Sequence, residues 1–330
     1  MLILSPADRA VEVPDLAAAG ADELYAGYVP PFWAKVFGPV VSCNRRSYDE
    51  ANVPSLDELS DLVRAAALRD VPVFLALNAS PVPEEMIPPM VGLAAELAGR
   101  GVRGVIVSDL SLLLALRDAR FRGLQIHAST LFSAFNGAAV AFLRRAGATR
   151  VILARGLSVA ETAGMVSAAP RTPLEVIGMR GRCPNIEGFC THLHDDPGRT
   201  WPCELRSEKA WLGDAPVIPD GIREAIERNE GTDRHFSCGL CAIPLLQRAG
   251  VHAFKVVGRG AELARKTAAV AAAAAMRDFG RSSVPDASAC ARRGKAMYRD
   301  MHGCPCRREN CYFPEFGPGL AGLPADGRSG

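Results

Sequence analysis

Residues 124–168 read LQIHASTLFSAFNGAAVAFLRRAGATRVILARGLSVAETAGMVSA and contain two short apolar runs, each followed by a segment of helix length. The runs Leu124–His127 and Arg150–Leu153 are typical of strands that are buried on both faces. Gly137–Ala146 and Val159–Ala168 are expected to form the helices. Alternation of this kind predicts a parallel sheet that is covered by helices.

The same alternation extends in both directions from this stretch. Six further runs are expected to be strands: Leu2–Leu4, Glu23–Ala26, Val71–Leu77, Gly104–Val107, Leu174–Ile177 and Ala253–Val257. Helices are expected at Ser55–Arg69, where Ser55 and Glu58 have the spacing of a capping box, and at Glu84–Gly99 and Ala261–Arg277. Eight strands alternating with helices predict an α/β fold, a TIM-type (βα)8 barrel.

An open doubly wound sheet is the alternative architecture. Dinucleotide-binding sheets of that type carry a Gly-x-Gly-x-x-Gly turn after the first strand, and here Ser5-Pro6-Ala7 follows instead. The barrel is therefore favoured. It is expected to span residues 1–280, with residues 178–251 as a long insertion between strands seven and eight. Residues 281–316 are expected to form a Cys-rich C-terminal extension, a short tail rich in Gly and Pro, and residues 317–330 to be disordered.

Composition indicates an ordinary globular chain, with 48% hydrophobic and 22% charged residues. The formal net charge of +2 is too small to indicate a strongly anionic partner, so we expect neither nucleic acid nor a membrane as partner. No apolar run approaches the roughly 20 residues that span a bilayer, and Met1–Pro6 is too short for a secretory segment. A cytoplasmic location is expected.

Ten cysteines are unusual in such a chain, and without a secretory segment they favour metal or redox use over disulfides. Five of them lie between the seventh and the eighth predicted strand: Cys183, Cys190, Cys203, Cys238 and Cys241. The segment that carries them starts at the barrel face on which active sites form in this fold. Thiolates suit either zinc or a cubane iron–sulfur cluster. Only Cys238 and Cys241 have the Cys-x-x-Cys form of a zinc knuckle, so the spacing slightly favours iron–sulfur.

Short motifs in a particular order give the chain a family resemblance over roughly residues 1–280. They are Ala18–Gly27, Leu77-Asn78, Ile106–Asp109, Ile126–Thr130 with Asn136, Val151–Arg155 with Leu157-Ser158, and Phe254–Arg259. In these motifs the chain resembles the U32 peptidase family, which includes subunits of an anaerobic ubiquinone-biosynthesis hydroxylase and proteins that hydroxylate cytidine or uridine in RNA.

The resemblance implies a [4Fe–4S] cluster held by Cys183, Cys190, Cys203 and a fourth ligand, for which Cys238 is placed ahead of Cys241. It also implies oxygen-independent hydroxylation, with oxygen drawn from a carboxylate co-substrate such as prephenate, and a homologous U32 subunit as a partner. Three positions depart from the family pattern, since Phe189 replaces an arginine, Leu131 a glutamine and Val257 a glutamate. The acceptor substrate therefore stays open.

Polar residues at the expected strand ends should gather at the barrel mouth. They are Asn78, Asp109, His127, Ser129, Arg155, Arg180, Arg182, Lys255 and Arg259. Arginine binds carboxylates through paired hydrogen bonds, so we expect Arg45, Arg155 and Arg182 to hold a carboxylate-bearing small molecule. For each of them a salt bridge at the barrel rim is the alternative. His127 is a candidate acid or base, and a hydrogen-bonded core residue is the alternative.

The remaining candidates for metal ligation are Cys241 and four cysteines of the extension, Cys290, Cys304, Cys306 and Cys311. The extension's four are enough for a second [4Fe–4S] cluster or a zinc ion, which would help a short tail to fold. A tail with incidental thiols is the alternative. Cys43 is expected to be an unligated thiol.

Three functions are compatible with these features: an oxygen-independent hydroxylase, a peptidase, and a non-catalytic iron–sulfur subunit. The peptidase has little support, because no His-Glu-x-x-His or Gly-x-Ser-x-Gly motif occurs. The hydroxylase is the preferred hypothesis.

Overall fold

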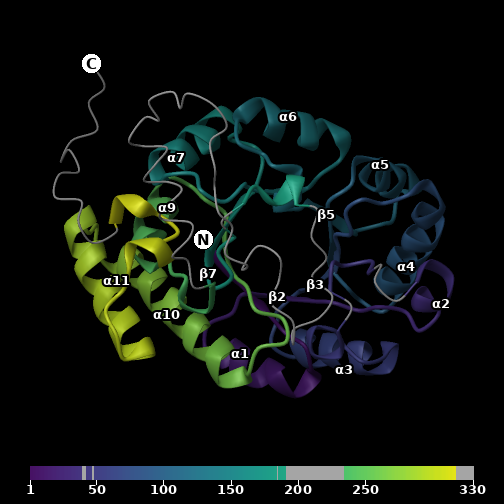
Figure 1. Cartoon of the computed structure of the whole chain (residues 1–330), viewed down its shortest axis with the longest axis horizontal. Helices are drawn as coiled ribbons and strands as arrows, with labels where there is room; N and C mark the ends of the chain where they lie inside the picture. The colour runs from purple at the N-terminus through teal and green to yellow at the C-terminus, as the bar shows by residue number, and fades with distance from the viewer. Residues whose placement is uncertain (39–41, 47, 184, 191–233, 317–330) are drawn as a thin grey trace, which may run out of the picture.

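Eight parallel strands close into a barrel in the order of the chain (Figure 1). The structure is a computed structural model that describes residues 1–38, 42–46, 48–183, 185–190 and 234–316. The strands are β1 (Leu2–Pro6), β2 (Glu23–Ala26), β3 (Val73–Leu77), β4 (Gly104–Val107), β5 (Gln125–Ala128), β6 (Arg150–Ile152), β7 (Leu174–Met179) and β8 (Ala253–Val256). Ile3 of β1 lies opposite Phe254 of β8, which closes the ring. The predicted (βα)8 barrel is confirmed.

Helices surround the strands and bury their apolar faces against them (Figure 1). The described α-helices are α1 (Val13–Ala18), α2 (Trp33–Phe37), α3 (Leu56–Ala67), α4 (Ile87–Gly99), α5 (Leu110–Ala119), α6 (Gly137–Ala146), α7 (Val159–Ala168), α9 (Ile243–Arg248), α10 (Leu263–Ser282) and α11 (Ala287–His302). None of these helices has the length and apolar character needed to cross a membrane.

The capping box predicted at the start of α3 is only half formed. Ser55 accepts a hydrogen bond from the backbone nitrogen of Glu58 at 3.1 Å. The Glu58 carboxylate does not reach back to Ser55, because it accepts a hydrogen bond from the backbone nitrogen of Ala10 at 2.8 Å. Glu58 therefore ties α3 to the loop after β1. A complete capping box occurs instead at the start of α7, between Ser158 and Glu161.

A layer of buried charges crosses the barrel interior. Arg150 of β6 donates two hydrogen bonds to Glu23 of β2, at 2.5 and 2.7 Å, and one to Glu175 of β7 at 3.0 Å. Residues two apart on a strand point to the same face. The charged layer therefore lies one step below Tyr25 and Ile152, which line the cavity at the barrel mouth.

The C-terminal extension was expected to be a short tail rich in Gly and Pro, and most of its described part is instead the 16-residue helix α11. Asp286 caps this helix by accepting a hydrogen bond from the backbone nitrogen of Ala289 at 2.6 Å. In Figure 1 α11 lies outside α10. A Cβ atom on Gly294 would lie 2.7 Å from Cys241 Sγ, so this glycine lets α11 approach the end of the insertion.

The predicted domain boundaries remain predictions. Residues 191–233 of the insertion and 317–330 of the tail, including the tail segment expected to be disordered, lie outside the described residues.

Candidate functional site

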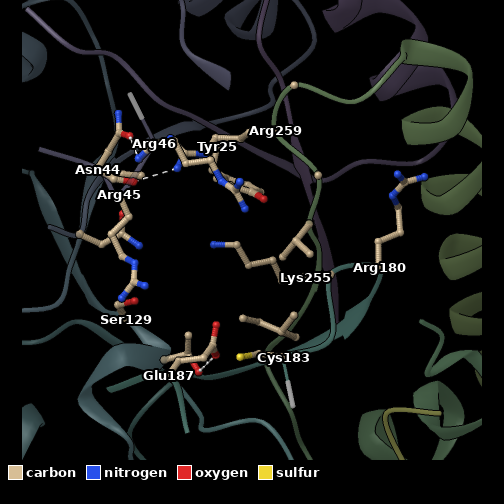
Figure 2. Close-up of a pocket in the computed structure, with 18 of the residues that line it drawn as sticks. Tyr25, Asn44, Arg45, Arg46, Ser129, Arg180, Cys183, Glu187, Lys255 and Arg259 are labelled. Atoms are coloured by element: carbon tan, nitrogen blue, oxygen red, sulfur yellow. Dashed lines mark hydrogen bonds between the residues drawn. The ribbon is translucent and has the colours of Figure 1, made fainter. Parts of the chain in front are cut away.

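A cavity of about 830 Å³ opens at the carboxyl ends of the strands (Figure 2). Inward-facing side chains of four strands form its floor: Tyr25, Ile106, Ile152 and Ile177. Loops that follow β2, β3, β5, β6, β7 and β8 form its wall, including residues 44–46, 129–131 and 257–262. Active sites of (βα)8 enzymes form in this position, which makes the cavity the candidate site.

The cavity wall carries more cations than anions. Its carboxylates are Glu50, Glu187 and Glu262, against the cationic side chains of Arg45, Arg46, Arg155, Arg180, Lys255, Arg259 and Arg265. In a partly enclosed space this excess attracts anions. Guanidinium groups in particular match the oxygens of carboxylates and phosphates.

Lys255 is the cation that extends furthest into the middle of the cavity in Figure 2. Its Nζ lies 3.6 Å from Glu175 Oε1 and 4.0 Å from the centre of the Tyr25 ring. Burial lowers the pKa of Lys255 to about 8, and Glu175 opposes this shift only in part. Lys255 therefore changes charge near neutral pH. From the sequence, Lys255 was predicted only as one of several polar residues at strand ends. The feature that could have indicated its importance is a lysine inside the apolar run Ala253–Val257.

Arg259 reaches the cavity beside Gly27, where β2 ends. Its Nη2 donates a hydrogen bond to the backbone oxygen of Asn44 at 3.0 Å, whereas Nη1 is buried and has no hydrogen-bond partner among the described residues. A Cβ atom on Gly27 would overlap Nη1 and would lie 2.9 Å from the backbone oxygen of Ala51. Gly27 is therefore required by the close approach of Arg259.

Replacing Gly27 with alanine should displace Arg259 and destabilise the fold by about 1–3 kcal/mol, because the added methyl group cannot fit. Urea unfolding measures the loss. Gly92→Ala is the matched control, since a Cβ atom at Gly92 in α4 meets no atom, and helix propensity there favours alanine. A Gly27→Ala variant as stable as Gly92→Ala would contradict the assigned packing.

Two arginines of the wall have a strained backbone. Arg45 and Arg180 have φ angles of 63° and 59°, in the left-handed region that side chains other than glycine seldom adopt. Arg180 is held there by hydrogen bonds from its nitrogen to the Ser237 oxygen, at 2.8 Å, and from Tyr312 Oη to its own oxygen, at 2.6 Å. Such strain concentrates at functional sites. It supports the prediction that Arg45 contacts a ligand.

Arg155 lies on the cavity wall but is already engaged by protein groups. Its Nε is 2.8 Å from Glu187 Oε2, an ion pair that is not aligned as a hydrogen bond. Its Nη1 donates to Tyr312 Oη at 2.9 Å and to the backbone oxygen of Gly181. Arg155 therefore forms the salt bridge that was the alternative to ligand binding, and it holds the loop after β7 in place.

Three other predicted residues do not line the cavity: Arg182, His127 and Asp109, which caps α5 by accepting a hydrogen bond from the Leu112 nitrogen at 3.0 Å. Arg182 is buried and donates through Nη1 to the backbone oxygen of Glu309, in the extension, at 2.8 Å. His127 is fully buried; its ring lies 4.4 Å from that of Phe74, and Nε2 is 3.1 Å from Gln125 Oε1. Burial, assisted by nearby Arg150, lowers the pKa of His127 well below its usual value. His127 is neutral at neutral pH, as the core-residue alternative expects.

The predicted cluster ligands are divided by the fold. Cys183 and Cys190 line the cavity, and Figure 2 shows the Cys183 sulfur facing it. Cys203 lies outside the described residues. Cys238 and Cys241 are not among the described residues that line the cavity; both are buried next to the extension. No three His, Cys, Asp or Glu side chains within the described ranges are arranged to hold a metal ion.

The other cysteines are dispersed. Cys290 is buried with its sulfur 3.9 Å from the backbone oxygen of Pro285, and Cys304 is exposed. Cys306 and Cys311 lie near Cys238 and Cys241. Cys43 is buried, and its thiol donates to the backbone oxygen of Tyr28 at 3.3 Å.

A family model described as peptidase family U32 matches residues 9–287. The chain belongs to peptidase family U32. Its family resemblance, inferred above from the order of short motifs, is thereby confirmed.

The chain is similar to several named proteins, two of which cover most of its length. The tRNA hydroxylation protein P of Haemophilus influenzae is 26% identical over 78% of this chain and 63% of its own length. The 23S rRNA 5-hydroxycytidine C2501 synthase of Escherichia coli is 24% identical over 78% of this chain and 36% of its own length. The chain thus spans between about one third and two thirds of these relatives. The solved U32 peptidase Mk0906 is 14% identical, with a TM-score of 0.48 over 78% of this chain and 93% of that chain.

The expectation that nucleic acid is not a partner of this U32 protein is corrected by these relatives, whose names place them on tRNA and rRNA. The expectation rested on a net charge of +2 for the whole chain. Net charge averages over the surface, and the structure gathers seven cationic side chains around one cavity. A phosphate group interacts with the local charge at the cavity, and the net charge of the whole chain does not reveal that local charge.

Proposed function

We propose that this U32 protein is an oxygen-independent hydroxylase that acts on a nucleobase in RNA. The observation that carries the proposal is the cavity at the carboxyl ends of the strands, where a cationic wall and two cysteines meet. The names of the relatives support hydroxylation and an RNA substrate. Single-stranded or unstacked bases are the form in which RNA bases reach enzyme pockets, and a cavity of about 830 Å³ has room for one base with its sugar.

In this proposal Cys183, Cys190 and Cys203 hold a [4Fe–4S] cluster, with Cys238 or Cys241 as the fourth ligand. The donor set fits, because Cys183 and Cys190 supply soft sulfur ligands at the cavity wall. The guanidinium of Arg155 lies within electrostatic range of Cys183, which favours the thiolate that ligation needs. When bound, such a cluster would supply single-electron transfer beside the substrate.

The cationic side chains are assigned to a carboxylate co-substrate that provides the oxygen atom, a dicarboxylate such as prephenate. Arg259 Nη1 and the Lys255 ammonium group both reach the same cavity, and Arg45 lies across from Lys255 in Figure 2. Separate cations suit a ligand with two carboxylates. The apolar floor of Ile106, Ile152 and Ile177 would contact a planar ring.

Affinity for the dicarboxylate should fall as pH rises through about 8, the pKa of Lys255. Below this pH Lys255 is protonated and attracts a carboxylate; above it the charge is lost, and the dissociation constant should rise by up to about tenfold per pH unit. Calorimetric titration with prephenate over a pH series measures the effect. The Lys255→Arg variant keeps its charge and should show no such rise, so an identical profile in both proteins would count against this role.

Nucleoside analysis tests the proposed function. RNA from cells that lack the gene should have lost one hydroxylated pyrimidine, detected by mass spectrometry as the disappearance of a nucleoside with one additional oxygen atom. Wild-type protein should restore it without dioxygen, and Cys183→Ala should not. An unchanged nucleoside profile in both tRNA and rRNA after deletion would contradict RNA hydroxylation.

A further inference from the structure

Lys255 carries an amine that its own strand holds inside the candidate cavity. The residue is 5% exposed, and its neighbours across β8 are Leu4 of β1 and Ile177 of β7. Figure 2 shows the side chain directed at the middle of the cavity. Because a strand fixes the backbone and packing fixes the stem, the amine meets a molecule that fills the cavity in a defined position.

The Lys255 amine makes no hydrogen bond to the described residues. Its Nζ is 3.6 Å from Glu175 Oε1, which is longer than a hydrogen bond, and this oxygen has no hydrogen-bond partner among the described residues. The Tyr25 ring, centred 4.0 Å from Nζ, attracts an ammonium group through its face but accepts no conventional hydrogen bond there. The nitrogen therefore remains available to a ligand.

Lys266 is the contrasting case of a buried lysine that is fully used by the protein. It is 1% exposed, and its Nζ donates to Asp8 Oδ2 at 2.5 Å and to both carboxylate oxygens of Glu12 at 2.8 Å. These bonds occupy the donors of an ammonium group. Lys266 is also outside the cavity lining of the described residues. Burial alone therefore does not explain the position of Lys255, whose nitrogen is left open toward the cavity.

A buried amine beside a carboxylate is suited to attack a carbonyl carbon. Burial lowers the pKa of Lys255 to about 8, so part of the amine is uncharged near neutral pH. The uncharged nitrogen is the nucleophile that forms imines with carbonyl compounds. Glu175 Oε1 is placed to hold the proton that the ammonium group releases, because it faces Nζ and has no hydrogen-bond partner among the described residues.

We propose that Lys255 forms a protonated imine with the oxo group of a 2-oxo acid that binds in the cavity. The carboxylate of such an acid adjoins its oxo carbon, so a cation in the same cavity can hold the carboxylate while the amine attacks. Arg259 is suited to this role, because it lines the cavity and its Nη1 is buried without a hydrogen-bond partner among the described residues. The inference rests on the proposed function for the identity of the acid, since prephenate is itself a 2-oxo acid.

Atoms and charge balance in this step without an added reactant. The ammonium group of Lys255 passes one proton to Glu175, and the nitrogen lone pair then forms a bond to the oxo carbon, whose oxygen receives the electron pair of the C=O bond. A second proton from nitrogen and the proton held by Glu175 convert this oxygen into water, which leaves as the C=N bond forms. One ammonium and one carbonyl group give one protonated imine and one water, with no oxidation or reduction.

An imine would both anchor and activate the co-substrate. A protonated imine withdraws electrons more strongly than the oxo group it replaces, so bonds at the adjoining carbon atoms become easier to break. Water would hydrolyse the imine, and the apolar floor of Ile106, Ile152 and Ile177 limits the water around it. The cavity therefore offers the surroundings that such an intermediate requires.

Reductive trapping in the full chain tests the imine. Purified protein is incubated with pyruvate, the simplest stable 2-oxo acid, or with prephenate, in the presence of cyanoborohydride, which converts an imine into a stable secondary amine. About one adduct per chain is expected, with the mass of the acid less one oxygen atom, and peptide mapping should place it on Lys255. Adducts spread over exposed lysines, with Lys255 unmodified, would overturn the proposal.

Two variants control for the general reactivity of lysines. Lys255→Met should form no adduct, whereas Lys35→Met should form as much as the wild type, because Lys35 is exposed on α2. Lys266 should stay unmodified in the wild-type digest, since its nitrogen is held by Asp8 and Glu12. Equal adduct in Lys255→Met and the wild type would contradict the assignment. The wild-type peptide map decides the question even where a variant does not fold.

Exchange of the oxo oxygen with isotopically labelled water tests the same step without a reductant. Each cycle of imine formation and hydrolysis replaces that oxygen with one from water, so the wild type should accelerate the labelling of pyruvate and Lys255→Arg should not. Equal labelling by both proteins would overturn the proposal.

These readouts do not depend on RNA. If the nucleoside product is present but neither trapping nor exchange occurs, the imine is refuted and hydroxylation stands. If Lys255 is trapped but gene deletion leaves RNA unchanged, the imine is supported and only hydroxylation is refuted.

Discussion

Replacing Arg150 with methionine is expected to destabilise the fold by about 3–5 kcal/mol, because it leaves two buried carboxylates without their cation. Arg150, Glu23 and Glu175 have side chains that are at most 5% exposed, and they hold three strands together across the barrel interior. Methionine has a similar length but offers no hydrogen-bond donor. Urea unfolding followed by circular dichroism measures the change in the free energy of unfolding.

Arg64→Met is the control for this prediction. Arg64 forms an ion pair with Asp61 on the surface of α3, where its side chain is 75% exposed, so its loss should cost less than about 1 kcal/mol. Equal stability of the two variants would show that the buried layer contributes no more than a surface pair. That outcome would contradict the placement of Arg150 inside the barrel.

Simultaneous replacement of Cys183 and Cys190 by alanine should abolish cluster binding and hydroxylation. Both residues line the cavity after β7, and a cubane cluster seldom persists when two of its thiolates are removed. We expect iron and sulfide to fall to background, with at least about a hundredfold loss of activity, the scale that loss of a cofactor-holding residue produces. Iron and sulfide assays on anaerobically purified protein provide the measurement.

Cys304→Ala is the matched control for the double variant, because Cys304 is exposed and lies outside the cavity lining of the described residues. Its iron content and activity should equal those of the wild type. Full iron and sulfide in the double variant would show that the cluster, if one is present, is held elsewhere.

The barrel could be predicted from the sequence because its signals are local. A strand buried on both faces, such as Gly104–Val107, is apolar throughout, and its limits were predicted to the residue. α6 and α7 were also predicted correctly, since helix starts such as Ser158 carry capping residues. α11 was missed because its run of Arg, Lys and Asp residues conceals the apolar spacing of Cys290, Gly294 and Tyr298.

The roles of the site residues depend on contacts between segments that are far apart in the sequence, so they could not be predicted from it. Arg155 and Arg182 seemed equivalent, yet one faces the cavity and the other faces the extension, 127 residues away at Glu309. The same holds for Cys238, which the family resemblance groups with Cys183 and the fold places beside Cys311. The pKa of Lys255 is lowered by burial, and this burial exists only in the closed barrel. Pairings between distant segments follow from the packed fold.

The central claim is that thiolates at the mouth of this barrel hold an iron–sulfur cluster for hydroxylation. Iron, sulfide and zinc should therefore be quantified in the full chain purified without oxygen. About four iron and four sulfide per chain are expected, with both lost from the Cys183→Ala, Cys190→Ala double variant. Zinc without sulfide in the wild-type protein would contradict it.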